Sequence, residues 1–485
     1  MNNLIRNELS KIFHKKAIYI VLIIILIFNI LNSVIEKFFI NNATVASIEI
    51  DYAKQQLHEI DVNDPSQKDL YYSLTADVKS YELAEKYSDD SWQKYIINSK
   101  GHTFIENMLR AEGTAEYDKY KQEYENFISL LDSNDWKRFA TQELELVNSQ
   151  LSAYSSSENE HPEDENYLSL KDQQKILKWR LEKNIPYGNN TLNSILDNWT
   201  TDSAQLRQIE SQAKIYKLSH EEEIRKQELD GNIKLYEYSI ENNINNKMEI
   251  NNINNQTAMS SNADMSIVQS STNYFEFVLI GCIIIAGTIV SDESNKGTIK
   301  LLLVRPYKRY KILLSKFISC LIMIIFFLLS TAIIQSIISG FSYGFDNYVG
   351  KIIVYNYKLG EVKTISTIGY SVLTAISVMP QYVLLVTLAF SISTILSNTA
   401  TAIALPLLGS MVSSIINVLF SRFKNANFLK FFVTPNWDLT NYLFGKIPPY
   451  EGLTLAFSIG ICLIYFIIMI TASFEIFKRK DIKNI

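Results

Sequence analysis

The amino-acid sequence predicts an all-α polytopic membrane protein with six transmembrane helices and a large, mostly helical extracytoplasmic domain between the first and second spans. Long apolar runs occur at 17–35 and repeatedly after residue 272, and about 20 apolar residues cross a bilayer as a helix. The segment 36–272 between them is polar, poor in Pro and Gly, and rich in Glu, Lys, Gln, Leu and Tyr, as is typical of helices. Charge divides in the same way, because about 40 of the 51 acidic residues but only about 23 of the 46 basic residues lie between positions 40 and 272.

Composition also argues against several kinds of function. The polar segment has no basic stripe of the kind that binds nucleic acid, so we expect no nucleic-acid partner. The three cysteines all fall in apolar runs, and the sequence has no HExxH and no Cys/His cluster, so we expect no disulfide in the polar domain and no metal site. No GxxxxGK[ST] occurs, so the chain lacks the loop with which many ATPases hold phosphate. We therefore expect no enzyme activity and no cofactor in this chain.

The first 16 residues predict an amphipathic helix lying at the cytoplasmic membrane interface. Five apolar residues share one helical face, and basic residues lie elsewhere: Leu4, Ile5, Leu9, Ile12 and Phe13 against Arg6, Lys11, Lys15 and Lys16. Residues 17–35 then form the first span, with one polar interruption at Asn29. A cleaved signal peptide is the alternative, but the small residue Ala46 lies well past the apolar run, which favours an uncleaved anchor.

Residues 36–272 are predicted to form the extracytoplasmic helical domain, which ends in an Asn-rich return linker over 242–273. A heptad-like apolar seam runs along 117–131. Further helices are expected at 69–87, 135–154, 167–183 and 203–229. The many tyrosines indicate packing between helices, with a peptide- or lipid-binding surface as the alternative.

Residues 273–485 are predicted to form a region of five transmembrane helices. The spans are expected at 274–290, 312–338, 369–396, 400–420 and 453–472. Alternation of apolar and polar residues over 351–366 predicts a small hairpin that turns at Leu359–Gly360. Pro380 is expected to kink its span. The segment 422–450 is rich in aromatic residues and too short to span, which predicts re-entrant or interfacial helices on the outer face.

The loop at 291–316 is the most informative stretch between two spans. It holds seven Lys or Arg residues, and basic loops between spans stay on the cytoplasmic side. That rule also places both chain termini in the cytoplasm, and it places 36–272 outside. Gly297 and Thr298 are expected to begin a short amphipathic helix, which Pro306 ends.

This loop resembles the signature of the type 2 ABC transporter permease family. In that family an acidic residue, a Gly-Thr pair, a leucine cluster, a proline, an arginine and a lysine follow one another at this spacing. The matching residues here are Glu293, Gly297, Thr298, Leu302, Pro306, Arg309 and Lys316. The end of the chain, from Phe477 through the basic residues to Asp481 and Ile482, is also similar. The resemblance covers the first 40 residues and everything after 272, about half of the chain, and leaves out the large polar insertion.

The resemblance implies a permease subunit of an ATP-driven exporter in the cytoplasmic membrane. It implies a separate ABC ATP-binding subunit, with ATP and Mg²⁺ on that partner, and a second permease copy or a related permease. It assigns the coupling to the ATPase to six residues of this chain: Glu293, Gly297, Thr298, Leu302, Pro306 and Arg309. The expected cargo is a hydrophobic or peptide-like substrate, such as an antimicrobial peptide.

Two other functions remain open from the sequence. The chain is alternatively a non-transporting membrane receptor or cell-envelope assembly protein, whose outer domain binds a partner, or a membrane-anchored structural protein with a coiled outer domain. An ATP-binding subunit encoded beside it favours the exporter. A soluble outer domain that binds a partner by itself favours the alternatives.

Overall fold

The computed structural model describes most of the chain: residues 1–41, 45–60, 64, 66–156, 164–188, 190–243, 275–298, 307–343, 345, 351–421, 427–448 and 450–479. The chain divides into two compact units. One, here called the apolar unit, comprises Met1–Phe38, Ile209–Gly231 and Met248–Ile485. The other, the polar unit, comprises Phe39–Gln208 and Asn232–Lys247. The predicted return linker lies almost wholly outside the described residues.

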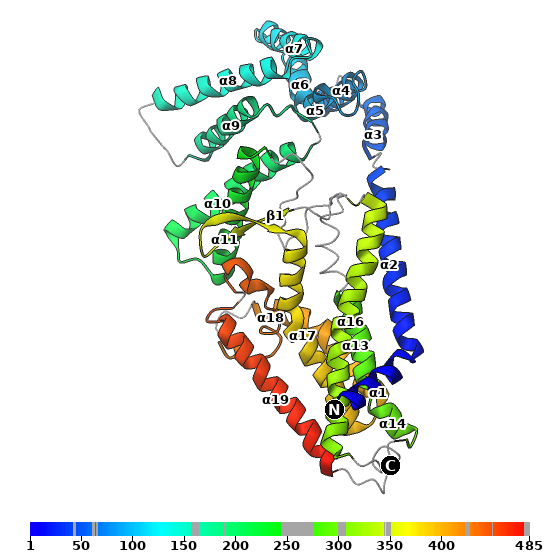
Figure 1. Ribbon diagram of the computed structural model, residues 1–485. Coiled ribbons are helices and arrows are strands. Elements are labelled where there is room, and N and C mark those ends of the chain that lie inside the picture. Colours follow the sequence, from blue (N-terminus) through cyan, green and yellow to red (C-terminus); the bar gives the residue numbers. More distant parts are fainter. Residues whose placement is uncertain are drawn as a thin grey trace. The chain divides into compact units, whose positions relative to one another are not determined.

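Four helices of the apolar unit are long and apolar enough to cross a membrane, within the described part of the chain. Their membrane-crossing stretches are Phe277–Asn295, Arg309–Ile338, Ile368–Leu396 and Leu455–Arg479. They belong to α13 (Phe275–Thr288) with α14 (Ser291–Asn295), α16 (Arg309–Tyr343), α17 (Thr367–Leu396) and α19 (Leu455–Arg479). These helices run beside one another (Figure 1). The second, third, fourth and sixth predicted spans are thereby confirmed as apolar helices.

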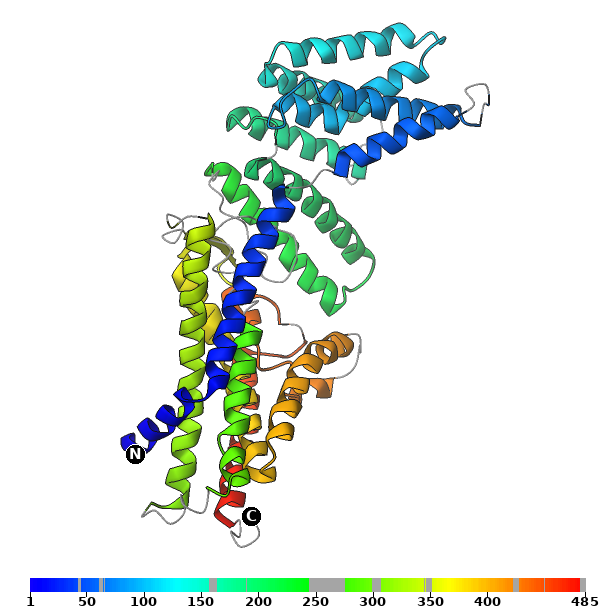
Figure 2. The ribbon, with the colours of Figure 1, turned by 90° about the vertical axis from the view of Figure 1, so that its right-hand side faces the viewer.

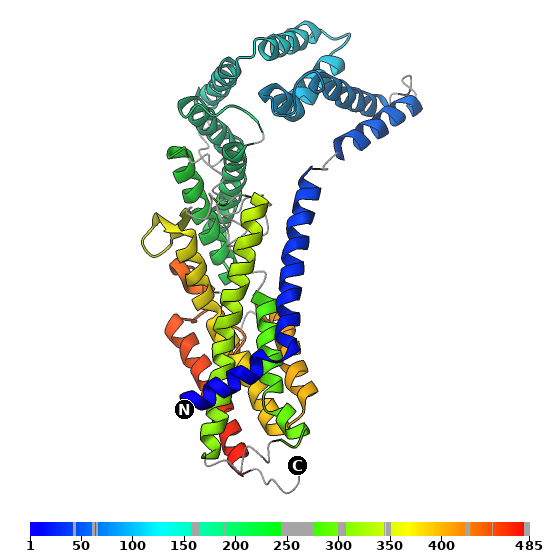
Figure 3. The same ribbon diagram turned by 45° about the vertical axis from the view of Figure 1, so that its right-hand side comes forward.

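The first and fifth predicted spans are a bent pair of helices and a shorter apolar helix. Helix α1 (Asn2–Phe13) meets α2 (Lys16–Asn41) at a bend of 60°, and the bent pair together passes the same test of length and hydropathy. Figure 3 shows α2 running alongside α13 and α16. Helix α18 (Thr399–Ser421) contains Pro406 and counts as a shorter apolar helix over Thr399–Ser413.

Apolar side chains on the outer surface of these helices explain why the unit belongs in a membrane. On α19, Leu463, Ile464, Ile467 and Ile468 are all more than half exposed. Water-soluble proteins rarely expose continuous apolar surfaces of this kind. The inward-facing residues of α13, α16 and α17 instead form one buried core with the first part of α2. The chain is therefore a membrane protein.

The short elements between the spans follow the sequence closely. Strands β1 (Lys351–Asn356) and β2 (Glu361–Ser366) pair antiparallel, as predicted, and Gly360 in the turn has a φ of +65°. Glycine takes this left-handed conformation without steric cost. The segment before α19 contains two 3₁₀ helices, η3 (Asn427–Phe431) and η4 (Thr440–Gly445). The predicted short helices are present there, and 422–426 and 449 lie outside the described residues.

The polar unit is helical throughout its described part. Its helices are α3 (Val45–Glu59), α4 (Lys68–Ala84), α5 (Trp92–Ile96), the π-helix η1 (Ile97–Gly101), α6 (His102–Arg110), α7 (Tyr117–Asp132), α8 (Trp136–Ser156), α9 (Glu165–Glu182), most of α10 (Thr191–Ile215) and the end of α11 (His220–Glu241). Its aromatic core includes Phe127, which stacks on Phe104 with ring centroids 4.5 Å apart. Phe127 and Leu131 of the predicted seam are buried.

One helix prediction in this region is wrong. A single helix was expected over 203–229, but the chain breaks after α10 and restarts at α11. The Ser219 hydroxyl accepts the Glu222 amide at 3.3 Å, and the Glu222 carboxylate accepts the Ser219 amide at 2.7 Å. This reciprocal pair is a capping box, which satisfies amides that a helix start leaves free. It fixes the beginning of α11 although neither Gly nor Pro interrupts the sequence there.

Candidate coupling site

The site is built from a charged residue on the buried face of α1. Leu4, Glu8 and Ile12 recur every four residues, so they share one face of the helix, and all three are buried. A carboxylate between two buried apolar residues requires a partner, because an isolated buried charge is costly.

Lys316 of α16 supplies that partner. Its side chain is 3% exposed, and its Nζ lies 2.7 Å from Glu8 Oε2 and 2.8 Å from Glu293 Oε2. Lys11 closes the arrangement from the other side, with its Nζ 2.9 Å from Glu8 Oε1 and 3.0 Å from Glu293 Oε1. These four residues, here called the charge cluster, alternate in sign and sum to zero. They join α1, α14 and α16, which are far apart in the sequence.

Two members of the charge cluster, Glu8 and Lys11, have pKa values shifted by their surroundings. Burial by itself raises the pKa of Glu8, but the ammonium groups of Lys316 and Lys11 outweigh burial and hold that pKa below its usual value. Burial likewise lowers the pKa of Lys11, but Glu8 and Glu293 outweigh it and raise that pKa above its usual value. Removing one member of such a buried set typically costs about 3–5 kcal/mol, because it leaves an unpaired charge.

A second set of contacts holds α14 in place. Lys15 Nζ lies 2.8 Å from Asp292 Oδ2 and donates to Thr288 Oγ1 at 2.8 Å. On the other side of α14, the Ser291 amide donates to Ser393 Oγ at 3.0 Å, and Thr399 Oγ1 donates to Ser291 Oγ at 2.9 Å. Helix α14 therefore contacts α17 and α18 as well as the α1–α2 junction.

The ends of the helices gather around this site. Figure 2 shows α1, α14, the start of α16 and the end of α19 at the same end of the apolar unit. Arg309, the first residue of α16, donates from Nη1 to the Lys478 carbonyl at 3.3 Å. A displacement of α14 at this end would thus act on several helices together.

Comparison with known proteins gives the chain a family. Residues 237–483 match the family described as "Protein of unknown function (DUF2705)". The chain belongs to this family. The matched part contains Glu293 and Lys316 of the charge cluster, whereas Glu8 and Lys11 precede it.

Two relatives come from Bacillus subtilis (strain 168). The first, described as an uncharacterized protein YhcI, is 32% identical over 223 residues, which is 45% of this chain and 69% of the relative. The second, described as an uncharacterized membrane protein YdbK, is 32% identical over 201 residues, or 41% of this chain and 76% of the relative. No solved structure matches the chain.

The six predicted coupling residues differ in their positions and contacts. Glu293 lies in the charge cluster and Arg309 contacts the end of α19. Gly297, with a φ of +67°, follows the end of α14, and Thr298 Oγ1 donates to the Glu293 carbonyl at 3.3 Å. A left-handed glycine at this place ends α14, and the helix expected to begin at Gly297 and Thr298 would run into residues that lie outside the described part of the chain. Leu302 and Pro306 lie outside the described residues.

Several residues of the site were missed from the sequence. Glu8, Lys11, Lys15 and Asp292 were assigned no coupling role, and Lys316 was noted only as part of the family pattern. Two signals were available. Glu8 occupies the apolar face of the first helix, and Lys316 is a single charge followed by a long apolar run. Charges in such positions almost always pair.

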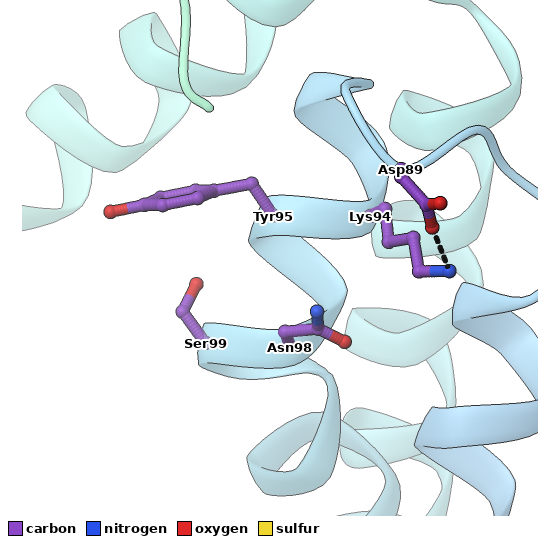
Figure 4. Close-up of a pocket in the computed structure, with 5 residues that line it drawn as sticks. All are labelled: Asp89, Lys94, Tyr95, Asn98 and Ser99. Atoms are coloured by element: carbon purple, nitrogen blue, oxygen red, sulfur yellow. Dashed lines mark hydrogen bonds and ion pairs between the residues drawn. The ribbon is translucent and has the colours of Figure 1, made fainter. Parts of the chain in front are cut away.

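A depression of about 480 Å³ in the polar unit is lined by Asp89, Lys94, Tyr95, Asn98 and Ser99 (Figure 4). Lys94 already pairs with Asp89 at 2.8 Å and with Glu85 at 2.9 Å. Among the described residues, no group of three or more His, Cys, Asp or Glu residues is arranged to hold a metal ion.

Proposed function

We propose that this chain is the membrane-spanning permease subunit of an ATP-driven ABC exporter, working with a separate ATP-binding subunit. The observation that carries the proposal is the charge cluster, which connects the loop resembling the family's coupling element to the N-terminal helix and to α16 through Glu293 and Lys316. A loop tied to two other elements by buried ion pairs is suited to receive force from a soluble partner and pass it on.

The proposal includes six membrane passages, formed by α2, α13, α16, α17, α18 and α19. The charge-cluster end faces the cytoplasm, because the loop beside it and both terminal segments are basic. Residues 36–272 and the segment 422–450 are then extracytoplasmic. The chain is a multi-pass protein of the cell membrane with both termini inside.

In the proposed mechanism, ATP binding draws two partner ATPases together, and their movement displaces α14. Lys316 carries the displacement to α16, while Lys11 and Lys15 carry it to α1 and α2. The contacts of Ser291 with Ser393 and Thr399 carry it to α17 and α18. Rigid helices linked in this way shift between two arrangements, one of which the nucleotide favours.

A second permease, either another copy of this chain or a related protein, completes the pathway. We propose a hydrophobic or peptide-like cargo, including antimicrobial peptides. The apolar unit has few charges in its spans, which argues against an ion-coupled carrier, because such carriers rely on those charges. This chain supplies no nucleotide site of its own in the proposal. ATP and Mg²⁺ bind the partner.

Purification of tagged chain from its own host in a gentle detergent tests the proposal. We expect a stoichiometric ATP-binding protein by mass spectrometry and vanadate-sensitive ATP hydrolysis in the eluate. The Glu293→Gln variant should retain the chain in the membrane and lose much of the hydrolysis. A chain that purifies without any nucleotide-binding partner would contradict the proposal and favour a receptor or assembly protein.

A further inference from the structure

The turn between α10 and α11 is fixed against the segment that leads into α19. His220 Nε2 lies 2.8 Å from the Pro448 carbonyl, and Gln227 Oε1 accepts the Ile447 amide at 2.7 Å. Glu228 and Lys446, both mostly buried, lie 3.9 Å apart. All of these residues belong to the apolar unit. The contacts hold the beginning of α11, and with it the preceding turn, beside residues 446–448.

Those residues lie where a membrane-spanning helix begins. Helix α19 starts at Leu455, a few residues after Pro448. Its first turn packs against η3, where the rings of Phe431 and Phe457 are 5.7 Å apart and Lys430 Nζ lies 6.0 Å from the Phe457 ring. The charge cluster lies at the opposite end of α19, near Lys478. The α10–α11 turn is therefore at the level where α19 enters the membrane.

The turn exposes apolar side chains at that level. Ile215 is 82% exposed and Tyr216 is 44% exposed. Exposed lysines, Lys214 and Lys217, flank them. The Tyr216 hydroxyl donates to Glu222 Oε1 at 2.8 Å, which ties the tyrosine to the first turn of α11.

A second group of exposed aromatic residues lies at the same entry to α19. Phe428 of η3 is 63% exposed, and Phe431 and Phe432 are also exposed. Single exposed apolar residues are common on protein surfaces. Two groups of them at the end of a membrane-spanning helix instead indicate an interaction surface.

We propose that the α10–α11 turn is a membrane-surface anchor, which inserts Ile215 and Tyr216 into the boundary between lipid headgroups and acyl chains beside η3. Aromatic and apolar side chains concentrate at this depth, because the acyl chains on one side are apolar and the headgroups on the other side are hydrated. Lys217 extends its ammonium group to lipid phosphate while its methylene chain covers apolar surface. Together, the turn and the exposed aromatic residues at η3 would fix the height of α11 above the bilayer. The inference does not rest on the proposed transport function.

A spin label placed on the full-length chain in lipid nanodiscs tests this anchor. The Ile215→Cys and Tyr216→Cys variants carry the nitroxide, and Glu112→Cys, an exposed turn position in the polar unit, is the matched control. The three native cysteines are buried, so the unsubstituted chain should take up little label. Power saturation then compares collisions with oxygen, which enriches in lipid, and with a nickel chelate, which stays in water.

The proposal predicts that the ratio of oxygen to nickel collisions is several-fold higher at positions 215 and 216 than at position 112. A ratio equal to that of the control at both positions would place the turn in water and overturn the anchor. Exclusion of both collision partners would show that another protein surface covers the turn, which would overturn the lipid assignment as well. Because two neighbouring positions are labelled, failure of one variant to fold leaves the other to decide.

Discussion

At the scale of single residues, the charge cluster depends most on Lys316. Its ammonium group is nearly inaccessible to solvent and contacts two carboxylates on different elements. Glu8 and Glu293 both depend on it, so its loss leaves two buried negative charges with only Lys11 between them. Lys316 thereby joins α16 to both α1 and α14.

Replacing Lys316 by methionine should destabilise the protein by about 3–5 kcal/mol, since a broken buried ion pair leaves uncompensated charge. Lys311→Met is the matched control, because Lys311 is an exposed lysine near the start of the same helix. Thermal unfolding in detergent, followed by size-exclusion chromatography, measures the difference. Equal melting temperatures for the two variants would count against the charge cluster.

The charge cluster also predicts a pH dependence. The pKa of Glu8 is below its ordinary value of 4.5 in the folded protein, so its stabilising contribution is complete above 4.5 and is lost as pH falls through the lower folded value. The melting temperature of the unsubstituted chain should exceed that of Glu8→Gln at neutral pH, and the gap should close in strong acid. A difference between the two melting temperatures that grows as the pH falls would contradict this prediction.

Parts of the site could be predicted from the sequence and parts could not. Glu293 and Arg309 follow a recognisable spacing, and Glu8 interrupts an apolar helical face in a way that indicates a partner. The pairing of Glu8 with Lys316 could not be predicted, because the residues are 308 positions apart and no local pattern relates them. The ion pair of Asp292 could not be predicted either, because an acidic residue beside a span is usually solvated.

At the scale of elements, α11 shows how a tight contact restricts the sequence. A Cβ atom at Gly231 would lie 2.5 Å from the Tyr357 hydroxyl oxygen and 2.7 Å from ring carbon Cε1. The Tyr357 amide in turn donates to the Phe444 carbonyl at 2.8 Å. Helix α11 can approach the β1–β2 hairpin this closely only because a glycine stands at the contact.

Gly231→Ala should therefore lower stability, although alanine normally stabilises a helix over glycine by roughly 0.5–1 kcal/mol. Gly460→Ala in α19 is the control, because nothing lies within 4 Å of a Cβ at that position. We expect the control to melt at the same or a higher temperature. Adding Tyr357→Ala should remove the clash and make Gly231→Ala less harmful. Stabilisation by Gly231→Ala alone would argue that the contact does not form.

The elements also show where sequence patterns succeed and fail. Apolar runs located four spans because a bilayer demands about 20 apolar residues in succession. The break between α10 and α11 was missed because Tyr216, Lys217 and Leu218 all suit a helix, and its signal was the spacing of Ser219 and Glu222. Gly297 ends α14, which the sequence did not indicate because α14 is only five residues long.

At the scale of the whole molecule, the proposed function requires parts of the chain on both sides of a membrane. In the proposed topology the charge cluster faces the cytoplasm and the acidic insertion at 36–272 is extracytoplasmic. The inference follows from the basic loops and the acidic insertion, which are features of the sequence.

Cysteine labelling in intact cells tests this division. A membrane-impermeant maleimide should modify Glu112→Cys in the polar unit and leave Lys296→Cys, beside the charge cluster, unmodified until the cells are opened. Both positions are exposed, so access to the reagent decides the result. Labelling of Lys296→Cys in intact cells would invert the proposed orientation.

A photo-crosslink from position 296 tests whether an ATP-binding subunit docks beside the charge cluster. A photoreactive amino acid replaces Lys296, which is exposed at the end of α14, and Glu112 carries the same probe as the control. After irradiation of cells, mass spectrometry identifies the proteins joined to each position. We expect an ATP-binding subunit joined to position 296 and absent from position 112. A position 296 that joins only lipid, or a protein without a nucleotide-binding domain, would contradict it.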